Sequence, residues 1–314
     1  MSITRALPFL LLIAGAVGIA LAMRKTRDEA PPARPINWSV SPPADQPRGE
    51  AFRVIRASSS PAARWKGTYT FEQSATGRFG GERTIPSRLL TGTFSATEAM
   101  SGPADAEEGA VDASFDFDEG GPASPTKRLF HAKLSFMKGA DGLVVHRSIH
   151  LDAPPDVTDA LEVFQFAWTQ RFFPPDRPIR AGERLAIDDC VELDDAFRRP
   201  LWFLFKDRAA KSGPVSEPVE GGAWIETREG GMDGVARLRA ALTHAHTGPT
   251  GPEGPSAVLV DYRAVLDGDR TIGLADGMTR RHALMLARRI HYTSRDLDYV
   301  VVVRGEISME QDAK

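Results

Sequence analysis

The sequence predicts a mostly β or α+β fold, in which an antiparallel sheet or open barrel packs against one long helix. Three observations support this prediction. Most regular stretches alternate apolar and polar residues with a period of two, as strands with one buried face do. Residues 154–173 carry the apolar spacing of a long helix. The 28 glycines and 23 prolines suit many short elements joined by turns.

Composition limits the classes of function. A chain of 314 residues, 42% of them hydrophobic, can bury a sizeable core without stabilisation by disulfides or metal ions. The formal net charge of −3 does not indicate a nucleic-acid-binding protein, because such proteins usually carry an excess of basic residues. Cys190 is the only cysteine, so no intramolecular disulfide can form. We predict no cofactor.

The N-terminal segment predicts delivery to a membrane. The eighteen residues Ala6–Met23 are uncharged and would span roughly 27 Å as a helix, enough for a thin bilayer core. Ala20–Ala22 fits the cleavage site of a secretory signal peptide, whereas Arg24 and Lys25 fit the flank of an uncleaved anchor. We expect an extracytoplasmic or periplasmic body. The positive-inside rule leaves open an anchored domain that faces the cytoplasm.

The remainder divides into a tether and one domain. Residues 24–49 are proline-rich without an apolar period, which predicts an extended tether after the targeting segment 1–23. No further boundary is visible, so we expect residues 50–314 to form a single β-rich domain.

Alternation predicts strands in the first half of this domain. Trp65, Tyr69 and Phe71 share one face of a strand, and residues 111–118 alternate apolar with mainly acidic residues. The stretches 129–137 and 143–151 flank a turn with two glycines, which predicts a hairpin.

The predicted helix is bounded by proline pairs at both ends. It places Phe164 and Trp168 on one apolar face of the helix. This face must pack against another element, most simply a sheet. With Tyr69 and Phe71, these aromatic residues are the candidates for core packing or for the lining of an apolar ligand site. Core packing is the simpler interpretation.

Strands resume after the helix. The apolar run Tyr299–Val303 predicts a central or fully covered strand. Met278–Tyr292 fits a basic helix or a strand, and we favour a strand that pairs with 299–303 across a short turn. Residues 248–255 are rich in glycine and proline and predict a surface loop. Further strands are expected at residues 185–193, 200–206, 223–227 and 257–266.

Residues 171–187, RFFPPDRPIRAGERLAI, resemble a segment of exported bacterial proteins of unknown function. In that group a proline-containing turn leads through a P-hydrophobic-x-x-G step into a strand. Pro178, Ile179 and Gly182 match this step, whereas Arg184 stands where an aromatic residue is common. The resemblance implies export and no particular activity.

Histidines supply the candidates for a metal site. In an extended chain His244 and His246 share one face about 7 Å apart, within reach of one ion, but no third ligand lies near them in sequence. We favour exposed polar histidines here. His146 and His150 would lie about 13 Å apart in a strand, too far to share a zinc ion.

The most basic stretch contains Arg280, Arg281, Arg288 and Arg289. These residues are candidates for contact with anionic lipid headgroups. The alternative is a solvated face paired with acidic residues. The sequence contains no G-x-S-x-G or S-x-x-K nucleophile motif and no glycine-rich phosphate loop.

These features lead us to expect a non-enzymatic, envelope-associated protein, membrane-tethered or secreted, that binds a partner protein or an apolar ligand between sheet and helix. One alternative is an extracytoplasmic hydrolase without a recognisable motif. Another is a structural component of the envelope.

Overall fold

The fold is known from a computed structural model, which describes eleven ranges of the chain. They are residues 35–39, 41–54, 63–79, 82–101, 107–119, 127–138, 144–152, 177–185, 220–231, 234–250 and 258–312. The predicted helix, the targeting segment Ala6–Met23 and the strand expected at 200–206 lie outside these residues. No helix within the described ranges is both long and apolar enough to cross a bilayer.

The described residues are mostly β-strands, which confirms the β-rich fold. Eleven antiparallel strands form one sheet in the order β6-β5-β4-β3-β2-β13-β12-β11-β10-β9-β8. The strands are β2 Ala63–Phe79, β3 Glu82–Ser101, β4 Glu107–Glu119, β5 Lys127–Lys138, β6 Val144–Asp152, β8 Arg184–Leu185, β9 Glu220–Glu229, β10 Val235–Thr250, β11 Val258–Gly273, β12 Thr279–Thr293 and β13 Leu297–Gln311.

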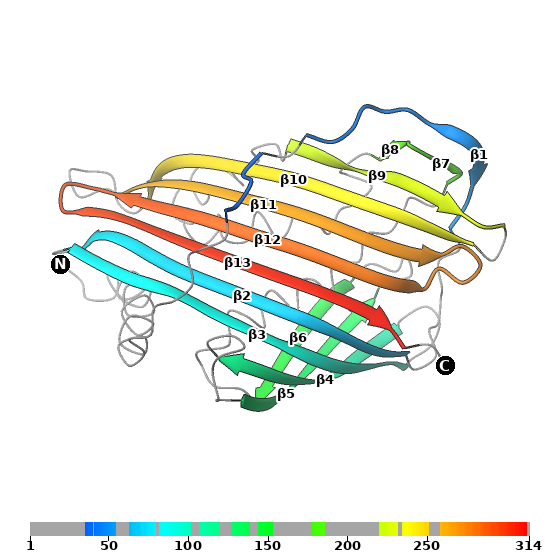
Figure 1. Cartoon of the computed structure of the whole chain (residues 1–314), viewed down its shortest axis with the longest axis horizontal. Coiled ribbons are helices and arrows are strands. Elements are labelled where there is room, and N and C mark those ends of the chain that lie inside the picture. The colour runs from blue at the N-terminus through cyan, green and yellow to red at the C-terminus, as the bar shows by residue number, and fades with distance from the viewer. Residues whose placement is uncertain are drawn as a thin grey trace.

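Two series of sequential neighbours build this sheet. β2 to β6 pair in chain order, and so do β8 to β13. The two series meet where β13 pairs with β2 along its full length, from Leu297 opposite Phe79 to Gln311 opposite Trp65. Strands from the two ends of the domain therefore lie side by side in the middle of the sheet (Figure 1).

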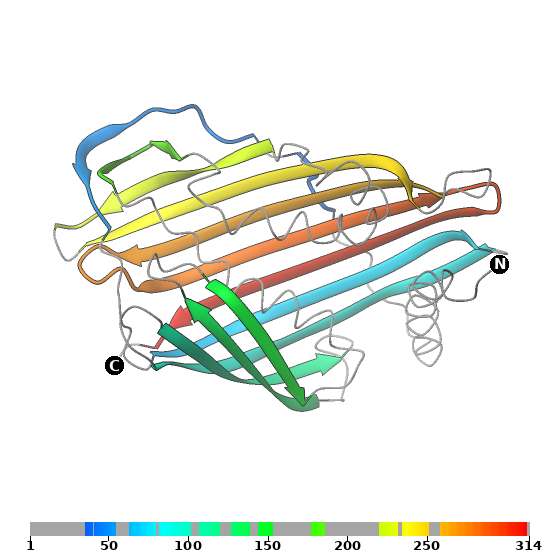
Figure 2. The same cartoon turned by 180° about the vertical axis from the view of Figure 1, so that it is seen from behind.

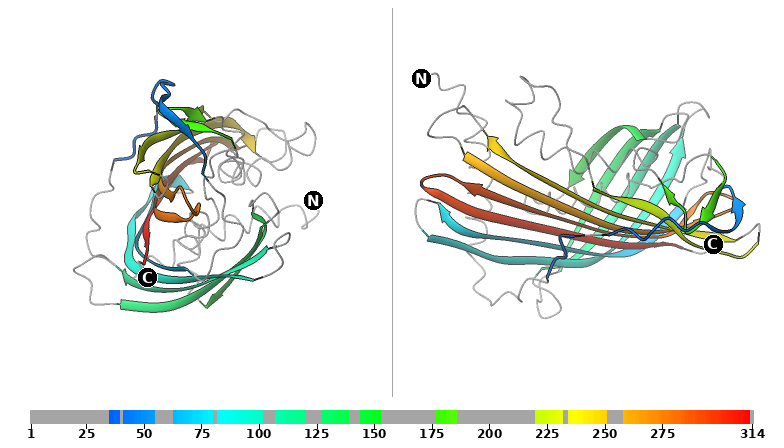
Figure 3. Two further views of the ribbon diagram at one scale, coloured as in Figure 1. Left: turned by 90° about the vertical axis from the view of Figure 1, so that its right-hand side faces the viewer. Right: turned by 90° about the horizontal axis from the view of Figure 1, so that it is seen from above.

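The sheet is strongly curved. β4, β5 and β6 turn behind the other strands in Figure 1 and stand in front of them in Figure 2. Seen along the strands, the sheet describes an open C (Figure 3, left). Side chains that alternate along each strand therefore project either into the concave face or onto the convex face.

A second, two-stranded sheet holds the start of the domain. β1 (Arg48–Phe52) pairs antiparallel with β7 (Ile179–Ala181). The Gln46 amide donates to the Gly182 carbonyl at 3.0 Å, and the Arg184 amide donates to Asp45 at 2.9 Å. The boundary predicted after residue 49 thus falls inside a strand, because β7 supplies the backbone partners that residues 45–52 lack on their own.

Several predictions for individual strands are confirmed. The hairpin of residues 129–151 is the β5–β6 pair, and the segment 278–292 is a strand, β12, that pairs with β13. β13 lies between β12 and β2, so the run Tyr299–Val303 is central. The surface loop predicted at 248–255 is wrong at its start, because β10 continues to Thr250 opposite Val258.

Candidate functional site

The concave face is an apolar surface. Residues opposite one another on neighbouring strands share a face, so Leu242, Leu266 and Leu286 form a row across β10, β11 and β12. Phe71 on β2 continues this row beyond Gly305 of β13. The large buried apolar side chains of this face include Trp65, Tyr69, Phe71, Leu90, Phe94, Leu238, Leu242, Val260, Tyr262, Leu266, Leu284, Leu286, Ile307 and Met309.

Two of the four predicted aromatic candidates can be placed. Tyr69 and Phe71 lie on the concave face, are 3% and 2% exposed, and belong to the core cluster. Phe164 and Trp168 lie outside the described residues. Half of the predicted aromatic set therefore lies on the concave face, as buried core residues.

On β12 and β13, burial falls toward one end of the concave face, whereas Val260 and Tyr262 of β11, in the same rows, stay fully buried. Leu284 and Leu286 on β12 are buried, whereas Ile290 and Tyr292 farther along the strand are only half-buried. On β13, the concave residues from Leu297 to Val303 are half-buried, and Ile307 and Met309 are buried. We call this half-buried region the open end; it consists of Ile290, Tyr292, Leu297, Tyr299, Val301 and Val303.

The open end contains a directly opposed tyrosine pair. Tyr292 on β12 faces Tyr299 on β13 in the register. Burial raises the pKa of Tyr292 to about 12, and Tyr299 adds to this effect. Tyrosines present an apolar ring with a polar tip, a combination suited to a boundary between apolar and aqueous surroundings.

Basic side chains interrupt the apolar concave face. Arg270 is 1% exposed, and its Nε donates to Thr279 Oγ1 at 2.7 Å. His282 stands opposite Arg270 on β12 and is also buried. Half-buried Arg288 lies in a row between Ala264 and Val303, beside the open end. Among the described residues of β2 and β9–β13, the concave positions include no aspartate or glutamate.

Tyr262 lies close to Arg288 on this face. It is diagonal to Arg288 in the β11–β12 register, because Ala264 faces Arg288 and Tyr262 faces Ile290. Burial raises the pKa of Tyr262 to about 12, and the positive charge of Arg288 opposes that rise. The Tyr262 hydroxyl thus stays protonated in ordinary buffers beside a positive charge.

His244 and His246 share the concave face, as their spacing predicted. The expectation that they are exposed is wrong for His244, which is 3% exposed and packs edge-on against Tyr262 with ring centres 6.3 Å apart. Its burial follows from the continuation of β10 to Thr250, which keeps both histidines within the sheet. Within the described ranges, no group of three or more histidine, cysteine, aspartate or glutamate side chains could hold a metal ion.

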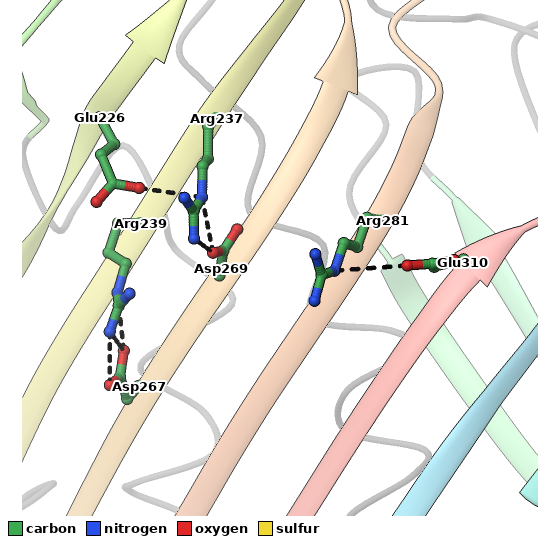
Figure 4. A network of polar contacts seen from close by, with 7 residues as sticks. All are labelled: Glu226, Arg237, Arg239, Asp267, Asp269, Arg281 and Glu310. Carbon is green, nitrogen blue, oxygen red and sulfur yellow. Dashed lines mark hydrogen bonds and ion pairs between the residues drawn. The ribbon is translucent and has the colours of Figure 1, made fainter.

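The convex face carries cross-strand ion pairs (Figure 4). Arg239 donates to both carboxylate oxygens of Asp267, at 3.0 Å and 2.8 Å. Arg237 pairs with Asp269 and also with Glu226, which lies 3.0 Å away. Glu226 reaches this face because the register of β9 and β10 shifts beside it, so that one extra residue is accommodated in β9.

The four arginines proposed for lipid contact do not form one surface. Arg280 pairs with Asp276 beside the turn that precedes β12, and Arg281 lies 3.8 Å from Glu310 on the convex face. Arg289 pairs with Asp261 at 3.0 Å on the convex face. Arg288 alone projects from β12 into the concave face beside the open end.

Two shallow hollows lie side by side on the convex face, against the strands at the centre of the sheet. The larger, of about 570 Å³, involves β2, β3, β4 and β13, and its lining includes Thr68, Ser95, Ser114 and Asp116. The smaller, of about 350 Å³, shares Thr68 with it and extends to Arg239. Neither hollow collects the predicted site residues, except that Tyr69 contributes to the smaller one.

A serine and a histidine meet at the edge of the larger hollow. Ser114 Oγ on β4 lies 3.0 Å from His131 Nδ1 on β5. Asp152 occupies the position opposite His131 on β6. The sequence gives no local signal for this pair, because only the pairing of β4 with β5 brings the two residues together.

Comparison with known proteins adds no assignment. No protein-family description matches the chain, and no curated protein sequence matches it. The geometry of the two faces is therefore the basis for a functional proposal.

Proposed function

We propose that this chain is a non-enzymatic, envelope-associated binding protein that holds an apolar ligand against the concave face of its curved sheet. The observation that supports the proposal is the mainly apolar concave face of β2 and β9–β13, which becomes half-buried on β12 and β13 at the open end. The apolar inner face of a curved sheet is one of the surfaces on which proteins bind apolar ligands.

The proposed entry for the ligand is the open end. In the described part of the chain, β6 and β8 are the outer strands of the sheet and do not pair with each other. Half-buried Val301 and Val303 are the aliphatic side chains nearest the middle of the open end. A ligand that enters there would meet Ile290 and then the buried leucines of β12.

The test uses two neighbouring valines that face opposite ways. Val303 lies on the concave face, and Val302 on the convex face opposite Arg289. We expect the wild type to bind the uncharged apolar dye N-phenyl-1-naphthylamine saturably. Val303→Trp, which fills the concave face, should weaken that binding by about tenfold or more, and the control Val302→Trp should not. Fluorescence titration measures both constants. Equal effects of the two variants, or no saturable binding, would contradict the proposal.

The envelope location rests on the sequence of Ala6–Met23. A reporter that is active only outside the cytoplasm, fused after Lys314, should give a signal. A silent reporter would place the body in the cytoplasm. Full-length protein of unprocessed mass in the soluble fraction of a lysate would remove the membrane targeting altogether.

One pair of residues supports the alternative of a hydrolase. Ser114 and His131 are within hydrogen-bonding distance beside the larger hollow. The arrangement lacks an oxyanion hole. β4 pairs with a strand on both sides at Ser114, so its backbone amides form the hydrogen bonds of the sheet and do not point at a substrate. Loss of a measured esterase activity in Ser114→Ala, with dye binding retained, would favour the hydrolase.

A further inference from the structure

We infer that the convex face binds an uncharged oligosaccharide in the two adjoining hollows that cross the sheet from β10 to β4. This inference goes beyond the proposed function and does not depend on it, because the apolar ligand is assigned to the opposite face of the same strands. It assigns a second ligand class, a polyhydroxylated one, to side chains that carry hydroxyl groups.

Small side chains form the floor that the two hollows share. Ser308 on β13, Thr68 on β2 and Thr93 on β3 stand directly opposite one another in one row of the convex face. Ser95 faces Ser114 in the next row. Thr68 and Ser308 line both hollows, which have volumes of about 570 and 350 Å³, so the two hollows form one continuous depression.

The hydroxyl groups of this depression are accessible to a ligand. Thr68, Thr93 and Ser95 are exposed, and Ser114 and Ser308 are half-buried. Each hydroxyl can donate one hydrogen bond and accept others, as a sugar hydroxyl does. Polar residues are expected on a solvated face, and these are distinguished by the hollow that they line together.

The ion pairs of the convex face favour an uncharged ligand. Apart from Asp116, each charged residue that lines the hollows has an ion-pair partner among the described residues. Arg239 donates to Asp267 (Figure 4), and Lys66 Nζ lies 2.6 Å from Asp312. A charged ligand would compete with these partners, whereas a neutral hydroxyl can hydrogen-bond beside them.

Asp116 supplies the strongest acceptor in the larger hollow. It is half-buried, stands opposite Thr93 and lies two residues from Ser114 on the same face of β4. Its two carboxylate oxygens can accept hydrogen bonds from two neighbouring hydroxyls of one sugar ring. Such charge-assisted hydrogen bonds are stronger than those between neutral groups.

The length of the depression suits several sugar units in a row. Its lining runs from Arg239 on β10 to Asp116 on β4, across β11, β12, β13, β2 and β3. At a strand spacing of about 4.8 Å, these steps correspond to roughly 29 Å along the sheet. A single sugar would fill only part of this length.

The experiment compares uncharged and cationic probes by isothermal titration calorimetry. The uncharged probes are maltohexaose and cellohexaose, and the cationic probe is spermine. We expect the wild type to bind at least one hexasaccharide saturably, and glucose about tenfold or more weakly. Binding of neither hexasaccharide overturns the inference, and so does binding of spermine alone, which would identify a cation site at the carboxylates. Neither result affects the proposed apolar site, which the dye titration tests separately.

Two matched pairs of threonines test the location. Thr68→Val with Thr93→Val keeps the shape of both side chains but removes two hydroxyls, which should weaken hexasaccharide binding by about tenfold or more. Thr76→Val with Thr97→Val is the control, because these threonines are also exposed on the convex face of β2 and β3 but line neither hollow. Equal effects of the two double variants, or an unchanged affinity in the first, overturn the assignment.

Asp116→Asn provides a second, independent variant. It keeps the size of the side chain and removes the charge, so hexasaccharide binding should weaken by about tenfold. Circular dichroism verifies that each variant is folded. An unchanged affinity in folded Asp116→Asn shows that the ligand does not contact this carboxylate and overturns the placement in the larger hollow.

Discussion

The concave and convex faces of the same strands differ in chemistry although the residues alternate one by one. On β11, Tyr262, Ala264 and Leu266 project into the concave face, while Asp261 and Arg263 project outward. A charged side chain on the convex face remains largely hydrated, as Arg263 does. An arginine such as Arg270, which is 1% exposed, loses its hydration and depends on the partners that the protein provides. A polar residue on the concave face is therefore a stronger indication of a specific role than one on the convex face.

Neighbouring residues of β2 offer the largest expected effect. Phe71 is buried on the concave face, and Thr70 is half-buried on the convex face. Phe71→Ala should lower the free energy of unfolding by about 3–5 kcal/mol, because it removes a large buried ring and leaves a cavity. Thr70→Ala should change it by less than about 0.5 kcal/mol. Urea denaturation measures both. Similar losses in the two variants would contradict the assignment of the faces.

The buried Tyr262 predicts a loss of stability in alkali. Its pKa is raised to about 12 by burial, whereas in the unfolded chain it titrates at about 10. Between these values the unfolded state has lost the proton and the folded state retains it. The contribution to stability is complete below about pH 10 and is lost as the pH rises toward 12. Its full size is about 3 kcal/mol.

Tyr262→Phe removes this titration. The variant should lose less stability than the wild type between pH 10 and pH 12, measured by urea denaturation at each pH. At pH 7 the two proteins should differ by only about 1 kcal/mol, the contribution of an ordinary hydrogen bond. Parallel pH profiles of the two proteins would show that Tyr262 does not titrate in this way.

Two threonines on opposite faces sharpen the comparison for buried polar groups. Thr279 accepts a hydrogen bond from buried Arg270 at 2.7 Å, whereas Thr271 lies on the convex face opposite Arg237. Thr279→Val keeps the shape of the side chain but removes the acceptor, which should destabilise the fold by about 1.5–3 kcal/mol. Thr271→Val should cost less than about 0.5 kcal/mol. Thermal unfolding of both variants tests the difference.

Local patterning explains what the sequence could predict of the fold. Period-two alternation assigned Trp65, Tyr69 and Phe71 to one buried face, and the apolar run Tyr299–Val303 indicated a central strand. The pairing of β13 with β2 was not predicted. It joins residues more than two hundred positions apart, and no local signal encodes such a contact.

The candidate site was predicted less completely. Among the four arginines of the basic stretch, the alternation within β12 distinguishes Arg288 from Arg289, but only once the segment is known to be a strand. Arg270 was not predicted to lie on the concave face, because arginine side chains are usually exposed to solvent. The register with Tyr262, Ala264 and Leu266 places it on the concave face, so the alternation of β11 could have revealed it.

The smallest expected effect concerns the ion pairs of the convex face. Arg239 and Asp267 are both about one-third exposed and form two hydrogen bonds. Solvent screens such a pair, so Arg239→Gln should cost less than about 1 kcal/mol. A double-mutant cycle with Asp267→Asn should give a coupling of about 0.3–1 kcal/mol that largely disappears in 1 M salt, where the Debye length is about 3 Å. A coupling that resists salt would mean that this part of the convex face is shielded from solvent, and the contrast between the two faces would then be one of charge instead of hydration.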